Sequence, residues 1–115
     1  MMLETAKELE KTVLVCYSNK SDKENYHSED SLIELKFLAE TAGAVVMKSY
    51  YQSNNTYDSR TMIGKGKVNE IAEYVNDNKI ALVIFENELA FTQIRNLEQK
   101  IKCKIMDKSN LILDI

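Results

Sequence analysis

The sequence has no proline and only three glycines among its 115 residues. Two of these glycines lie in one four-residue run, Gly64-Lys65-Gly66-Lys67. Because glycine allows backbone conformations that other residues avoid, a chain with so little of it concentrates its backbone freedom at one place. Residues 64–67 are therefore the first candidate for a functional segment.

Other absences exclude whole classes of protein. No apolar run approaches the ~20 residues that a membrane-spanning helix needs. The start of the chain, MMLETAKE, is acidic and lacks the hydrophobic core of a secretion signal. The two cysteines, Cys16 and Cys103, lie in apolar strand-like runs, which predicts buried free thiols in a reducing cytoplasm. The single histidine, His27, has no nucleophile partner in any motif, so we expect neither a catalytic site nor a metal site.

Charge is unevenly distributed along the chain, whose net charge is −3. Residues 22–40 contain six acids and two lysines, whereas residues 60–67 contain three basic residues and no acid. Residues 100–108 add four lysines and one aspartate. Such runs are typical of solvated surfaces, but two basic runs on an acidic chain also suit a molecule with one basic side.

Apolar periodicity predicts alternating strands and helices. Strands are expected at 12–18, 44–51, 81–86 and 104–106, and helices at 29–42, from about 67 to 75 and from about 92 to 101. Strands separated by helices form parallel sheets, because the chain must cross back over the sheet. The prediction is a single α/β domain with a small open, mainly parallel four-stranded sheet and helices on both faces.

The glycine run does not complete the known phosphate-binding motifs. Ser59 and Thr61 stand where a Walker A loop needs its first glycine, and Val68 follows Lys67 where that loop needs Ser or Thr. Asn69 stands where a dinucleotide fingerprint needs its third glycine. A phosphate or RNA site could still form from the glycine backbone, the N–H groups of the following helix and three cations, Arg60, Lys65 and Lys67. A tight turn without a ligand is the alternative.

Three further groups of polar residues each allow two interpretations. The carboxyl ends of the strands should carry Ser18, Gln52, Glu86, Asn87, Glu88 and Asp107, whose acids could hold Mg²⁺ but more often cap helices or face water. Tyr50, Tyr51 and Tyr57 could stack on bases beside Arg60 or pack at strand ends. Gln93, Arg95 and Asn96, on the predicted outer face of the third helix, could contact a partner or be solvated.

Several segments together resemble the N-terminal domain of HflX-type GTP-binding proteins. The strongest match is RTMIGKGKVNEI at residues 60–71, followed by LVIFENEL at 82–89 with QIRNLE at 93–98, and IMDKSNLILDI at 105–115. A weaker match is LAETAGA at residues 38–44. The segments occur in the order and at the spacing of the family.

The resemblance implies an α/β domain that precedes a helical hairpin and a Ras-like GTPase domain in the family. It implies a cytoplasmic protein that binds the large ribosomal subunit and rRNA and couples GTP hydrolysis to rescuing or splitting stalled ribosomes. GTP and Mg²⁺ would bind in the GTPase domain, whose motifs are absent here, so we expect no cofactor and no enzymatic activity in this chain. Residues 1–11 are then a flexible or helical lead-in, and residues 109–115 begin a severed helical linker.

The sequence departs from the family pattern at three places. Ser59 replaces a usual proline, Ala90-Phe91 replace a usual Ser-Pro, and Asn110 replaces a usual glycine. Thr92 is then expected to cap the third helix.

The leading hypothesis is an rRNA-contacting module that uses Arg60, Gly64, Lys65, Gly66 and Lys67. Secondary candidates are Arg95, Asn96, Lys100, Lys102 and Lys104. The alternatives are an accessory ATP- or GTP-binding domain that uses the same loop, and a scaffold that regulates the GTPase domain.

Overall fold

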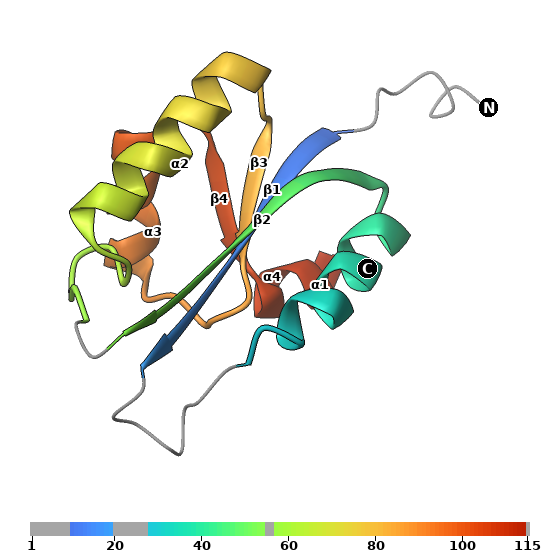
Figure 1. Cartoon of the computed structure of the whole chain (residues 1–115). Helices are drawn as coiled ribbons and strands as arrows, with labels where there is room; N and C mark the ends of the chain where they lie inside the picture. Colours follow the sequence, from blue (N-terminus) through green and yellow to red (C-terminus); the bar gives the residue numbers. More distant parts are fainter. Residues whose placement is uncertain (1–9, 20–27, 55–56, 115) are drawn as a thin grey trace.

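The computed structural model describes residues 10–19, 28–54 and 57–114. Four strands and four helices alternate along this part of the chain (Figure 1). They are β1 (Glu10–Asn19), α1 (Ser31–Thr41), β2 (Ala44–Asn54), α2 (Lys65–Asn78), β3 (Leu82–Phe85), α3 (Phe91–Ile101), β4 (Lys104–Asp107) and α4 (Lys108–Asp114).

The strands form one sheet in the order β2-β1-β3-β4, and all three pairings are parallel. The predicted α/β class is confirmed, and the sheet is parallel throughout rather than mainly parallel. Helices α2 and α3 cover one face of the sheet, and α1 and α4 cover the other (Figure 1). The long edge strand β2 carries a register shift opposite Thr12 and Val13.

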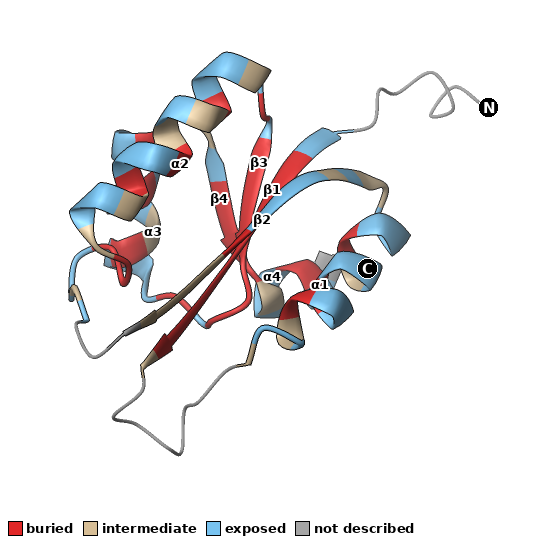
Figure 2. Cartoon of the chain, in the orientation of Figure 1, coloured by how far each residue is buried: buried red, intermediate tan, exposed pale blue. Residues whose placement is uncertain are grey.

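The two faces of the sheet bury two separate apolar clusters. Along β1, Val13 and Val15 belong to the cluster beneath α2 and α3, whereas Leu14 and Cys16 belong to the cluster beneath α1 and α4. This alternation follows from the period-2 geometry of a strand. Residues 12–18 are all buried, as the near-continuous apolar run predicts for a central strand of a parallel sheet (Figure 2).

Some boundaries differ from the predicted ones. α2 begins at Lys65, two residues earlier than expected, so Gly66 lies inside its first turn. α4 begins at Lys108, one residue before the helix that was expected to start in residues 109–115. Of the expected lead-in, residues 1–9 lie outside the described residues, and Glu10 and Lys11 already belong to β1. His27 also lies outside them. No helix among the described residues has the length and apolarity to cross a membrane.

Candidate nucleic-acid interface

The segment before the glycine run is a tight turn. Asp58 and Met62 pair through backbone hydrogen bonds of 3.4 Å (Asp58 N to Met62 O) and 2.6 Å (Met62 N to Asp58 O). At the tip, the N–H of Arg60 donates to Asp58 Oδ1 at 2.9 Å. Met62 adopts a φ of 70°, a left-handed conformation that is costly for a side chain of this kind and persists where the surroundings determine it. These hydrogen bonds fix the turn over residues 58–62.

Helix α3 holds this turn in place. The Gln93 amide nitrogen donates to Tyr57 Oη at 2.7 Å and to the Ser59 carbonyl at 3.3 Å, and Asn96 Nδ2 donates to the Arg60 carbonyl at 3.1 Å. Gln93 is buried, so its predicted position on the outer face of the helix was wrong. A buried amide must have its hydrogen bonds satisfied, and the turn supplies the acceptors.

The same glutamine caps α3. Gln93 Oε1 accepts the N–H of Ala90, the residue just before the helix, at 2.8 Å. The expected cap at Thr92 was therefore wrong: the helix begins at Phe91, and Thr92 already lies within its first turn. One side chain thus fixes both the helix start and the turn.

The start of α2 is open to its surroundings. Gly64 precedes the helix and donates its N–H to Gln52 Oε1 at 3.3 Å. Neither Gly64 nor Gly66 has a positive φ, and a Cβ added at either would meet nothing within 4 Å. The fold itself therefore does not require glycine at these positions. The first turn has no acidic residue and no side-chain cap, which leaves the positive end of the helix dipole unneutralised.

Basic side chains lie beside this helix start. Lys67 Nζ is 3.0 Å from Glu70 Oε1 and 5.6 Å from the centre of the Tyr50 ring. On the neighbouring strand, Lys48 Nζ is 4.9 Å from the Tyr50 ring centre and 5.1 Å from that of Tyr74. Two ammonium groups thus share one aromatic ring. Lys48 has no ion pair with any described residue.

Sequence analysis missed Lys48. A signal was present in the two-residue spacing of Lys48 and Tyr50, because residues at that spacing lie on one face of a strand. The spacing alone does not show that Tyr74 of α2 lies next to Lys48.

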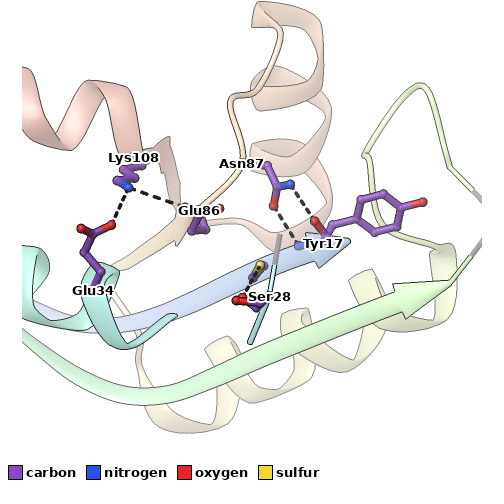
Figure 3. Close-up of polar contacts among 7 residues, drawn as sticks. Tyr17, Ser28, Glu34, Glu86, Asn87 and Lys108 are labelled. Atoms are coloured by element: carbon purple, nitrogen blue, oxygen red, sulfur yellow. Dashed lines mark hydrogen bonds and ion pairs between the residues drawn. The ribbon is translucent and has the colours of Figure 1, made fainter. Parts of the chain in front are cut away.

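Asn87 lies at the position where doubly wound sheets bind nucleotides. The chain runs from β1 to β2 on one side and returns to β3 on the other, so the strand order reverses between β1 and β3. There Asn87 Oδ1 accepts the Tyr17 N–H at 2.8 Å, and Asn87 Nδ2 donates to the Tyr17 carbonyl at 2.7 Å (Figure 3). The amide continues the pairing of β1 beyond the end of β3.

The acidic residues at the strand ends also form hydrogen bonds and ion pairs that stabilise the fold. Asp107 accepts the N–H of Leu89 at 3.0 Å and that of Asn110 at 2.9 Å, and so joins the β3–α3 loop to the start of α4. Lys108 Nζ lies 2.9 Å from Glu34 and 3.6 Å from Glu86 (Figure 3). The hydrogen bond to Glu34 is the main cause of the raised pKa of Lys108. No group of metal-ligating side chains occurs in the residues that the structure describes.

Both cysteines are free thiols. Cys16 is buried in β1, and burial, with a smaller effect of the Glu86 charge, raises its pKa to about 12. Cys103 lies just before β4 and is only partly buried, so the prediction of a buried strand position was wrong for this residue. Burial still raises its pKa to about 11. Both thiols are therefore protonated at neutral pH and poorly nucleophilic.

The comparisons with known proteins agree with the resemblance in the sequence. The family model described as GTP-binding GTPase N-terminal matches residues 29–115. The GTPase HflX of Flavobacterium psychrophilum is 40% identical over 92% of this chain. The chain belongs to the HflX family. The GTPase HflX of Caldanaerobacter subterraneus is likewise 40% identical, over 99% of the chain. The chain spans about a quarter of the length of each of these relatives, 25% and 26%.

A solved structure has the same fold as this HflX-family domain. It is a GTP-binding protein from the archaeon Sulfolobus solfataricus in complex with GDP, and it superposes with a TM-score of 0.59 at 23% identity. The match covers 90% of this chain and 29% of that one. At this identity the comparison shows the fold alone.

In this HflX-family domain the predicted site residues fall into two groups. One group lies at the carboxyl ends of the strands: Arg60 in the turn, Gly64, Lys65, Gly66 and Lys67 at the start of α2, and Arg95 and Asn96 on the first half of α3. The other group lies where α3 ends and β4 begins: Lys100, Lys102 and Lys104. A helix rises ~1.5 Å per residue, so the 11 residues of α3 place these lysines near the opposite end of the domain.

Proposed function

We propose that this domain is the rRNA-contacting part of an HflX-type GTPase and that its contact surface is the basic start of α2 with the adjoining turn. In this proposal the longer parent protein carries a GTPase domain that binds GTP and Mg²⁺. The parent is cytoplasmic, binds the large ribosomal subunit and acts in rescuing or splitting ribosomes, and this domain itself catalyses no reaction.

The observation that carries the proposal is the open space at Gly64 and Gly66. Glycine is present at two positions where an added Cβ would meet nothing within 4 Å. A partner whose backbone approaches the helix start would explain both residues. The uncapped N–H groups and Lys65, with no acid in the first turn, favour a phosphate as the approaching group. Arg60, exposed at the tip of the fixed turn, adds charge nearby.

The two alternatives have less support. At the position where a nucleotide would bind in a doubly wound sheet, the Asn87 amide is already hydrogen-bonded to the backbone of Tyr17, so the α2 start is the better-supported place for accessory nucleotide binding. A scaffold that only regulates the GTPase domain would not need the exposed cations.

The test is co-sedimentation of the chain with purified large ribosomal subunits at low and near-physiological salt. The Lys65→Ala/Lys67→Ala double variant is expected to bind roughly tenfold or more weakly and to show a salt slope smaller by about two, because each phosphate contact releases about one counterion. The Lys100→Ala/Lys102→Ala variant removes the same charge from the far end of α3 and should bind almost normally. Equal losses in both variants, or unchanged binding of the first, would contradict the assignment.

A further inference from the structure

The edge strand β2 contacts α2 through a line of three polar and aromatic side chains. Gln52, Tyr50 and Lys48 alternate along β2, so they lie on one face of the strand. The Gln52 amide oxygen accepts the N–H of Gly64 at 3.3 Å, and the Tyr50 ring centre is 5.6 Å from Lys67 Nζ. The line therefore starts at the proposed RNA contact. A strand rises about 3.3 Å per residue, so the line leads roughly 13 Å along the sheet edge to Lys48.

Two aromatic rings hold the Lys48 side chain on this line. Its Nζ is 4.9 Å from the ring centre of Tyr50 and 5.1 Å from that of Tyr74 on α2. The two rings meet edge to face, with centres 6.3 Å apart and planes at 79°, and Tyr50 is buried. Lys48 itself stays exposed. An ammonium group that is already positioned loses less side-chain freedom when it binds an anion.

Two ammonium groups approach the Tyr50 ring, and only one of them has an ion-pair partner among the described residues. Lys67 Nζ lies 3.0 Å from Glu70 Oε1, whereas Lys48 contacts only the rings. The two nitrogens can be no further apart than their combined distances from the ring centre. Like charges at this range repel each other, and an anion between them would relieve the repulsion.

We propose that the RNA contact continues from the start of α2 along β2, and that Lys48 and Lys67 hold neighbouring phosphates of one RNA strand. The inference rests on the proposed RNA contact and adds a residue and a direction to it. A line of this length suits a backbone that carries a phosphate at every nucleotide better than a single mononucleotide. β2 is an edge strand of the described sheet, so a large partner can reach it.

The first test is co-sedimentation of Lys48→Gln with purified large ribosomal subunits over a salt series. Loss of one phosphate contact should weaken binding roughly three- to tenfold and lower the salt slope by about one. Lys48→Arg keeps the charge and should retain both the affinity and the slope. Lys36→Gln is the matched control, because Lys36 is an exposed lysine of α1 on the opposite face of the sheet. It should bind like the unchanged chain.

Glu70→Gln tests the same site in the opposite direction. The Glu70 carboxylate partly neutralises Lys67 and would repel a phosphate beside it. Its removal should strengthen binding roughly two- to fivefold, and a gain in affinity cannot come from a loss of folding. Glu40→Gln, at an exposed glutamate of α1, makes the same change in net charge and should have little effect.

The outcomes separate this inference from the wider proposal. Weak binding of Lys65→Ala/Lys67→Ala with normal binding of Lys48→Gln would refute the path along β2 and leave the contact at the α2 start intact. Absence of binding by the unchanged chain would refute both. Equal losses in Lys48→Gln and Lys36→Gln would show a response to net charge alone and would refute the path.

One further outcome concerns the open strand edge. Lysines on edge strands also prevent pairing with strands of other chains. If Lys48→Gln made the chain self-associate and left subunit binding unchanged, Lys48 would protect the edge of β2, and the proposed phosphate contact would be refuted. Sedimentation velocity of the variant without ribosomal subunits measures the self-association.

Discussion

At the residue scale, Asn87 forms hydrogen bonds with Tyr17, which lies 70 positions earlier in the chain. Its amide makes both a donor and an acceptor bond to the backbone of buried Tyr17. Asn87→Ala removes two buried hydrogen bonds to the backbone of Tyr17. We therefore expect the free energy of unfolding to fall by about 2–4 kcal/mol, since removing one partner of a buried hydrogen bond costs about 1–3 kcal/mol. Urea denaturation followed by circular dichroism measures the change.

Asn96→Ala is the matched control for this prediction. It removes the same side chain and one hydrogen bond, to the carbonyl of Arg60, at an exposed site. Water can replace that bond, so the expected loss is below about 1 kcal/mol. Equal losses in the two variants would show that the pairing of Asn87 with Tyr17 contributes no special stability.

At the scale of single elements, apolar spacing predicted the helices and strands well. Val68, Ile71 and Val75 are all buried on α2, as their helical spacing predicts. The start of α2 was misplaced because glycine usually marks a helix boundary. In the first turn the N–H groups lack intrahelical partners in any case, so Gly66 is tolerated there. The contacts of Gln93 and Asn96 with the turn span 34–36 residues, and a local periodicity carries no information about them.

The position of Gly66 in α2 leads to a prediction in which stability and binding change in opposite directions. Gly66→Ala should raise the free energy of unfolding by about 0.5–1 kcal/mol, because φ is compatible with alanine and the added Cβ meets nothing. The same methyl should hinder an approaching phosphate and weaken ribosome binding. Thermal unfolding and the co-sedimentation assay measure the two effects.

Gly43→Ala serves as the opposite case. Gly43 has a φ of 98°, so alanine should destabilise the fold by about 1 kcal/mol or more although nothing lies within 4 Å. If Gly66→Ala stabilised the fold and ribosome binding stayed unchanged, the close approach of a phosphate at this helix start would be ruled out.

At the scale of the whole molecule, α4 packs as part of the domain. Leu111 is 4% exposed within the apolar cluster beneath α1 and α4, and Lys108 pairs with Glu34 of α1. The family resemblance implies that residues 109–115 begin a linker, and a linker would contribute little to the stability of the domain. The packing instead places the first two turns of this helix within the cooperative unit, so that any segment following α4 would start from a fixed position.

Two leucines of α4 distinguish these possibilities. Leu111→Ala removes a buried side chain, and we expect a loss of about 2–4 kcal/mol in the free energy of unfolding. Leu113→Ala is the same substitution in the same helix at a residue that is 83% exposed, so it should change stability by less than about 0.5 kcal/mol. Chemical denaturation of both variants measures the difference. Small and equal effects would mean that α4 frays from the domain. A large difference would mean that α4 is held in one orientation on the domain, because the helix cannot rotate without exposing Leu111. The helix would then fix the direction of any segment that follows it.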